Sequence, residues 1–209
     1  MPRPSRFTTD DVLDAALQSI AEKGRDVTIS MIADHLGGPV GSIYHRFESR
    51  DEILVRLWLR CVRRFQAAFI SAAEDNDDPF EALLACAVSI PRFCAEHPAE
   101  AVGLTLYRQE RLLATLPSGA LRDEVAGMNI DVMELMTTLA RRQYPDARDA
   151  VERVDLAIRV IPYGIVRGLL GGPIPALIEP AVIAAAKAVL SADTTTTPPP
   201  HSGSASPAS

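Results

Sequence analysis

Apolar residues recur every three or four positions through most of this 209-residue chain. The first such segment lies between Thr8 or Thr9, which can cap a helix, and Gly24, which can end one. Its apolar residues share one helical face: Val12, Leu13, Ala16, Leu17 and Ile20. Only 5% of the residues are aromatic, so a sheet has little to build on. The pattern predicts an all-α fold.

Glycines, prolines and capping residues divide the chain into expected helices. Pro162 should kink the helix expected at 147–170, because proline lacks the N–H that a helix needs. The fourth helix would be about 30 Å long, enough to join an N-terminal head to a larger body. We expect a helix-turn-helix head at residues 1–48, a helical body at 49–190 and a disordered tail at 191–209, which is rich in Thr, Pro and Ser. The expected helices are 8–24, 28–36, 40–47, 50–71, 80–96, 104–114, 121–139, 147–170 and 180–190.

Residues 28–50 have the pattern of two short helices that cross at a steep angle. Such a pair needs a small residue at the crossing, a flexible turn residue and an aliphatic anchor, which Ala33, Gly37 and Ile43 supply in that order. An ordinary helical hairpin can show the same spacing. The polar and small residues of 40–45 are, however, of the kind that enters a DNA major groove.

This segment resembles the N-terminal domain of the TetR family of regulators. The family pattern is present as Thr28, Ile32-Ala33, Gly37, Ile43-Tyr44-His45-Arg46-Phe47 and Ser49-Arg50-Asp51-Glu52-Ile53. Two positions depart from it. Gly38 stands where an apolar residue usually packs, which is expected to loosen the turn, and Arg50 replaces the usual lysine but keeps its charge.

The resemblance implies a sequence-specific, DNA-binding transcriptional regulator, expected to be a repressor that a small ligand releases from double-stranded operator DNA. It implies phosphate contacts from Thr28, Tyr44 and Arg50, and base contacts from Val40, Gly41, Ser42 and His45. Alternatively, Tyr44 could be half-buried core beside Phe47, and His45 a plain surface residue. Arg3 and Arg6 could reach an adjacent groove or form an untethered basic terminus.

The resemblance further implies that the body forms a homodimer and encloses an effector pocket. Segments 147–170 and 180–190 are too apolar for helices with one exposed face, which favours a dimer interface there over a monomer core. Asn129 lies among apolar residues and must find a partner, either protein or ligand. Methionines adapt to varied shapes, so the ligand is expected to be largely apolar. The candidate pocket residues, each of which could equally be core, are Phe93, Leu104, Tyr107, Met128, Asn129, Met133 and Tyr163.

Charge and cysteine content constrain location and partners. The net charge of −6 and pI near 5.2 argue against nucleic-acid binding by the protein surface as a whole. A DNA-binding head must therefore place its basic residues on the face that meets the DNA. The three cysteines form no CxxC pair, as in a reducing cytosol. No apolar run approaches the roughly 18 residues of a membrane span. We therefore expect a cytoplasmic protein with no membrane partner.

No residue set has the spacing of an enzyme site, so neither catalysis nor a cofactor is expected. Cys94 and His97 could share a metal ion, but a buried thiol and a helix-end histidine are far commoner, and no metal site is expected. A helical protein-interaction bundle without DNA binding is the remaining alternative, and it would suit the acidic composition better.

Overall fold

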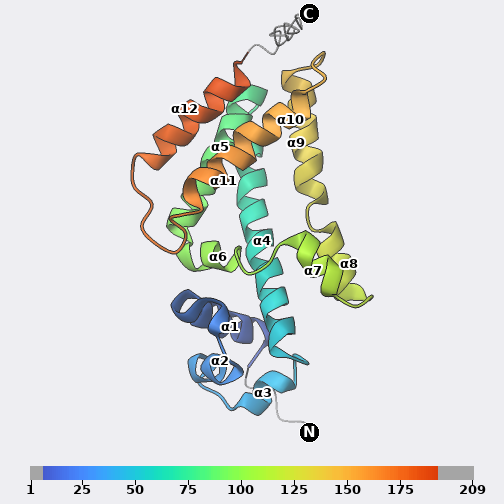
Figure 1. Ribbon diagram of the computed structural model, residues 1–209, viewed down its shortest axis with the longest axis vertical. Coiled ribbons are helices and arrows are strands. Elements are labelled where there is room, and N and C mark those ends of the chain that lie inside the picture. The colour runs from blue at the N-terminus through green and yellow to red at the C-terminus, as the bar shows by residue number, and fades with distance from the viewer. Residues whose placement is uncertain (1–6, 193–209) are drawn as a thin grey trace, which may run out of the picture.

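The computed structural model describes residues 7–192, and all regular secondary structure in that range is helical (Figure 1). The expected all-α fold is confirmed. Arg3, Arg6 and the tail from 193 onward lie outside the described residues. The helices are α1 (Thr9–Lys23), η1 (Gly24–Asp26), α2 (Ile29–Leu36), α3 (Val40–Tyr44), α4 (Arg50–Glu74), α5 (Pro79–Glu96), α6 (Pro98–Gly103), α7 (Gln109–Thr115), α8 (Ala120–Gly127), α9 (Ile130–Gln143), α10 (Ala150–Asp155), η2 (Leu156–Val160), α11 (Ile161–Val166) and α12 (Ile178–Leu190).

Helices α1 to α3 form the head, at one end of the long α4 (Figure 1). Thr8 caps α1 through a capping box: its hydroxyl accepts from the Asp11 N–H at 3.1 Å, and the Asp11 carboxylate accepts from the Thr8 N–H at 2.6 Å. The head's apolar residues are buried together with the first turns of α4, so one core cluster spans both. The orientation of the head is therefore tied to α4.

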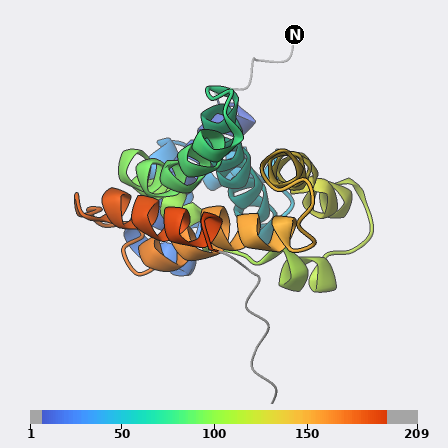
Figure 2. The same ribbon diagram turned by 90° about the horizontal axis from the view of Figure 1, so that it is seen from above.

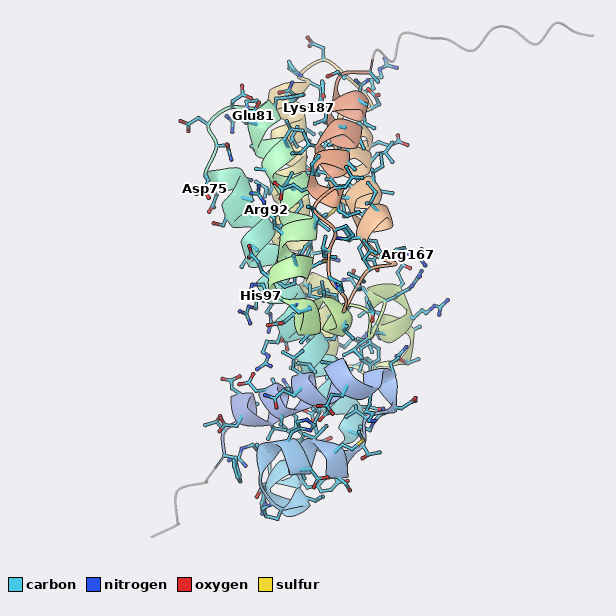
Figure 3. The ribbon with its side chains drawn as sticks, turned by 90° about the vertical axis from the view of Figure 1, so that its left-hand side faces the viewer. Asp75, Glu81, Arg92, His97, Arg167 and Lys187 are labelled. Carbon is cyan, nitrogen blue, oxygen red and sulfur yellow. The ribbon has the colours of Figure 1, made fainter. Side chains whose placement is uncertain are left out.

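The 25 residues of α4 extend about 37 Å, from the head into the body. Its far half packs against α5 and α9, and its residues Phe69 and Ala73 belong to a second core cluster that also contains residues of the C-terminal helices. Seen from above, α12 and the α10–α11 segment lie together along one side of the body (Figure 2). Helix α12 lies beside α5, which carries Arg92 (Figure 3), and Arg92 donates to the Glu179 carboxylate of α12.

Two expected helices begin or divide elsewhere than predicted. His97 and Pro98 do end α5, but Pro98 then starts α6, because the first helical position needs no N–H partner. The helix expected at 104–114 consequently starts later, at Gln109. The single helix expected at 121–139 is divided between α8 and α9. Gly127 weakens the helix there, and the Asn129 side chain bonds to other helices.

The segment expected as one helix with a kink at Pro162 instead contains a π-helical turn. Ile161 donates its N–H to the Leu156 carbonyl, five residues back. A proline ring would collide with the carbonyl four residues before it, and widening the preceding turn relieves that contact. The helical path therefore continues through Pro162 without a break between η2 and α11.

Candidate DNA-binding site

The turn between α2 and α3 has the geometry that the spacing of Ala33, Gly37 and Ile43 predicts. Gly37 adopts φ 64° and ψ 34°, the left-handed conformation that favours glycine, and its N–H bonds back to α2. Ala33 and Ile43 are both buried. The two short helices therefore pack as a helix-turn-helix.

Gly38 does not loosen this turn, because the Phe7 ring occupies the space beside it. A Cβ atom at position 38 would lie 2.5 Å from Cε2 of Phe7, closer than two carbon atoms can approach. Phe7 thus supplies the apolar bulk that the family usually places at position 38. Arg46 holds the same segment, since its guanidinium donates to the Phe7 carbonyl and, at 3.0 Å, to the Ser42 carbonyl.

Helix α3 has one buried and one exposed side. Ile43 and Phe47 are buried, and Val40 packs partly against the same core. Tyr44 is 56% exposed, so it is not half-buried core. The exposed side consists of Gly41, Tyr44 and His45, with Ser42 at its margin. Of the predicted base contacts, Val40 and Ser42 are therefore less accessible than Gly41 and His45.

Thr28 caps α2, and its hydroxyl oxygen accepts from the Met31 N–H at 3.3 Å. This interaction uses the oxygen as an acceptor, so the hydroxyl hydrogen can still be donated to a phosphate. The predicted phosphate contact is compatible with the cap.

Arg50 is engaged within the protein. Its Nε donates to the Val27 carbonyl at 2.5 Å, another nitrogen donates to the Arg25 carbonyl, and a third lies 3.2 Å from the Asp51 carboxylate. The side chain thus fastens the first turn of α4 to the segment before α2. The predicted phosphate contact would have to share or replace these bonds.

His35 joins α2 to α1 on the other side of the head. Its Nδ1 lies 3.0 Å from the Met31 carbonyl and 3.1 Å from the Ser19 hydroxyl, and its Nε2 lies 3.3 Å from the Glu22 carboxylate. The Met31 carbonyl, followed by Glu22, raises the pKa of His35. These contacts stabilise the scaffold that carries α3.

The seven candidate pocket residues do not gather around one cavity. Leu104, Tyr107 and Met128 pack against the head-proximal core, and Phe93 is buried against Phe65 with ring centroids 5.4 Å apart. Met133 and Tyr163 are exposed on different helices. A shared ligand-binding role for the seven stays a prediction.

Asn129 finds protein partners. Its amide oxygen accepts from Gln66 of α4 at 2.9 Å, and its amide nitrogen donates to Gln109 of α7 at 2.8 Å. Gln109 in turn donates to the Val125 carbonyl of α8 at 2.7 Å. This chain of amides fastens α7 and α8 to α4.

Cys94 and His97 show no metal-site geometry. Cys94 is buried, whereas the His97 ring lies against Phe93 with centroids 5.0 Å apart. Within residues 7–192 no three His, Cys, Asp or Glu side chains are grouped to hold a metal ion. In the same range no helix is long and apolar enough to cross a membrane.

Burial raises the pKa of the Cys86 thiol from 9.0 to about 12, so the chain should lose stability at alkaline pH. The unfolded thiol ionises near pH 9 while the folded one stays neutral, so the thiol's contribution is intact below pH 9 and falls as the pH rises towards 12. Cys86→Ala should make the alkaline decline in unfolding free energy shallower by about 1 kcal/mol per pH unit. Urea unfolding between about pH 8 and 11 measures this slope. The control is Ser89→Ala, a buried change without a thiol; an unchanged slope in Cys86→Ala would contradict the prediction.

The fold and the exposed side of α3 define a class: helical proteins with an N-terminal helix-turn-helix joined by a long helix to a helical body. Residues 12–57 match the family model described as bacterial regulatory proteins of the tetR family. These residues therefore match the helix-turn-helix domain of the TetR family, as the sequence pattern predicted, and the family is described as one of regulatory proteins. No curated protein sequence matches the chain well enough to count as a relative.

Solved structures of transcriptional regulators share this fold. PfmR, a TetR family transcriptional regulator from Thermus thermophilus, superimposes with a TM-score of 0.68 at 22% identity, covering 88% of this chain and 96% of PfmR. The ketosteroid regulator KstR2 of Mycobacterium tuberculosis gives 0.65 at 21%, covering 88% and 94%. FadR from Bacillus subtilis, solved with stearoyl-CoA, gives 0.65 at 16%, covering 88% and 98%. The likeness extends beyond the matched N-terminal residues and shows that the helical body shares the fold of these regulators.

Proposed function

We propose that the chain is a homodimeric repressor that binds operator DNA through α3 and is released by a small, largely apolar ligand. The observation that carries the proposal is the division of α3: Ile43 anchors it in the core, while Tyr44 and His45 project from a helix-turn-helix of the TetR family. We assign residues 1–48 to DNA binding and 49–190 to dimerisation and ligand binding.

The proposed phosphate contacts are Thr28 and Tyr44, with Arg50 joining them if its present bonds rearrange. The proposed base contacts are Gly41, Ser42 and His45, and Val40 through its accessible part. Phosphate contacts would position the head, and base contacts would select the operator sequence.

An exposed apolar strip on the C-terminal helices supports dimerisation. Leu156, Val160 and Tyr163 are 42%, 43% and 45% exposed, and they follow one another at helical spacing. Beside them, α12 presents the small residues Ala181, Ala184 and Ala188 to the exterior. Pairing through these faces, within segments 147–170 and 180–190, would cover the strip and place two α3 helices on one operator, where half-sites lie about 34–36 Å apart.

The ligand response is proposed from the fold's relatives together with the coupling within this chain. FadR was solved with stearoyl-CoA, so a protein of this fold can hold a molecule with a long apolar part. In this chain one core cluster joins the head to α4, so a ligand that shifts the body relative to α4 would also reorient α3.

Binding to DNA selected from a randomised pool tests the proposal, by mobility shift across a salt series. Sequence-selective binding that weakens as salt rises is the expected result. No selective binding to the pool would overturn the proposal in favour of the protein-interaction bundle.

Tyr44→Phe should weaken operator binding about 5- to 10-fold, because one hydrogen bond to a phosphate is lost while the ring remains. The measurement is the dissociation constant from the same mobility shift. Thr138→Val is the matched control, since it also removes one hydroxyl from an exposed side chain but lies on α9, in the body and outside the proposed interface. Equal losses in the two variants would contradict a phosphate contact from Tyr44.

A further inference from the structure

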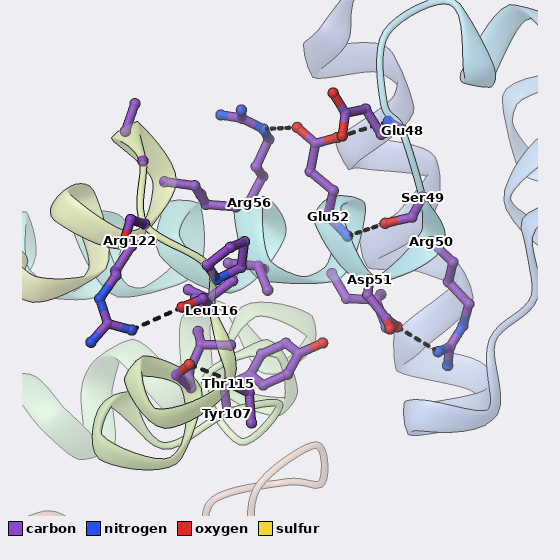
Figure 4. A pocket seen from close by; sticks show the side chains of 18 of the residues that line it. Glu48, Ser49, Arg50, Asp51, Glu52, Arg56, Tyr107, Thr115, Leu116 and Arg122 are labelled. Carbon is purple, nitrogen blue, oxygen red and sulfur yellow. Dashed lines mark hydrogen bonds and ion pairs between the residues drawn. The ribbon is translucent and has the colours of Figure 1, made fainter.

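A cavity of about 840 Å³ lies where the head meets the body. Of the seven pocket residues predicted from the sequence, Tyr107 alone lines it. The start of α4 forms one wall, and Tyr107 with the α7–α8 connection forms the other (Figure 4). Arg25 of the head completes the lining. The volume is within the range of sites that hold small organic molecules.

The lining combines an apolar surface with excess positive charge. Four arginines and three acidic residues line it, which leaves a net charge of +1. Partly exposed apolar surface comes from Leu116 and Leu121, and the lining residues Leu54, Val55 and Leu112 are themselves almost fully buried. A molecule that matches this cavity has an apolar part and a negative charge.

Two of the four arginines are balanced by carboxylates and two are not. Arg56 lies 2.7 Å from the Glu52 carboxylate, and Arg50 lies 3.2 Å from that of Asp51. Among the described residues, Arg25 and Arg122 have no carboxylate within ion-pair distance. The remaining acid of the lining, Glu48, is exposed to solvent.

The neighbours of Arg25 and Arg122 are neutral groups. The Arg25 guanidinium lies over the Tyr107 ring, 5.1 Å from its centroid. Arg122 donates to the carbonyls of Leu113 and, at 2.9 Å, Leu116. Ring and carbonyls orient these cations without neutralising them, so an anion entering the cavity would meet two uncompensated charges in a partly apolar surrounding.

We propose that this cavity binds an amphipathic organic anion, whose acid group is held by the charges of Arg25 and Arg122 and whose apolar part lies along the leucines of α4, α7 and α8. The inference rests on the proposed function and deepens it by naming the site and the chemical class of the effector.

The position of Arg25 links this site to DNA binding. Arg25 belongs to η1 in the head, Tyr107 belongs to the body, and the Arg25 carbonyl accepts from Arg50 at the start of α4. An anion that draws Arg25 away from Tyr107 therefore alters a contact between head and body. It also adds negative charge near the surface that must approach phosphates, so bound anion weakens operator binding, and by linkage operator weakens anion binding equally.

Calorimetric titration of the full chain with decanoate tests the site, and decyltrimethylammonium supplies the same chain length with the opposite charge. Decanoate should bind saturably, one molecule per chain, and at least about 10-fold more tightly than the cation. Arg25→Met and Arg122→Met should each weaken decanoate binding about 10-fold or more, as expected when a charged partner is lost. Arg148→Met, an exposed arginine beyond α9, should leave it unchanged.

Arg122→Met also removes two bonds to the α7–α8 connection, so its thermal unfolding is measured alongside. Arg25 is exposed and donates to no backbone carbonyl in the described structure, so Arg25→Met gives an independent result. Absence of saturable decanoate binding, or equal affinities in wild type and Arg25→Met, would overturn the inference.

The titration needs no DNA and the mobility shift needs no decanoate, so the two proposals fail separately. Selective DNA binding without decanoate binding would leave the repressor proposal standing and remove the cavity site. Decanoate binding without selective DNA binding would leave the cavity site standing and remove the repressor proposal. With both present, added decanoate should raise the operator dissociation constant of wild type but not of Arg25→Met.

Discussion

Replacing Val160 with glutamate is expected to convert the proposed dimer into monomers and to lower operator affinity roughly 100-fold or more. Val160 is 43% exposed in the single chain and lies in the apolar strip between Leu156 and Tyr163. A two-fold interface would bury two copies of the new carboxylate, and each unpaired buried charge costs several kcal/mol. A monomer would also engage only one half-site. Light scattering coupled to size-exclusion chromatography measures the mass, and mobility shift measures the affinity.

Met133→Glu is the matched control for this change. Met133 is 48% exposed, but it lies on α9 rather than on the C-terminal helices. The same apolar-to-acidic change there should leave both the mass and the operator affinity unaltered. A dimer that survives Val160→Glu, or one that Met133→Glu dissociates, would place the interface elsewhere.

The parts of the fold that could be predicted from the sequence are those governed by local rules. Thr8, Thr28 and Ser49 were readable as helix starts, because side-chain caps act within three residues. The separate helix α6 and the π turn before Pro162 were not predicted. Each depends on how a proline is accommodated: Pro98 starts a new helix, and the ring of Pro162 is relieved by a widened turn, and apolar spacing along the chain does not reveal which of these a proline will do.

The DNA-binding site was likewise predicted only in its local features. The helix-turn-helix was visible in the spacing of small and apolar residues, whereas its contacts with Phe7 and Arg46 were missed. The absence of bulk at Gly38 was a signal, because another apolar residue had to fill the space, and Phe7 is the large apolar residue just before the first cap. The candidate pocket residues lie apart because they come from α5, the α6–α7 connection, the α8–α9 junction, α9 and α11, and their relative placement depends on tertiary packing rather than on spacing along the chain.

Gly103→Ala is expected to lower the free energy of unfolding by about 1–3 kcal/mol, although it adds a single methyl group. Gly103 ends α6 where that helix crosses α4, and a Cβ there would lie 2.6 Å from the Cys61 sulfur. Cys61 is buried, so neither helix can accommodate the methyl group without a shift. Urea unfolding monitored by circular dichroism measures the loss.

Removing the sulfur should reverse much of this cost. In the Cys61→Ala/Gly103→Ala double variant the new methyl group occupies the space that the sulfur leaves, and the two Cβ atoms would lie 3.5 Å apart, which is ordinary contact. The double variant should therefore be more stable than the sum of the two single losses predicts, by roughly 1 kcal/mol or more. Gly164→Ala is the control, because a Cβ there meets no neighbour within 4 Å. Simple additivity in the double variant would mean that the close approach of α6 to α4 is not what makes glycine necessary at position 103.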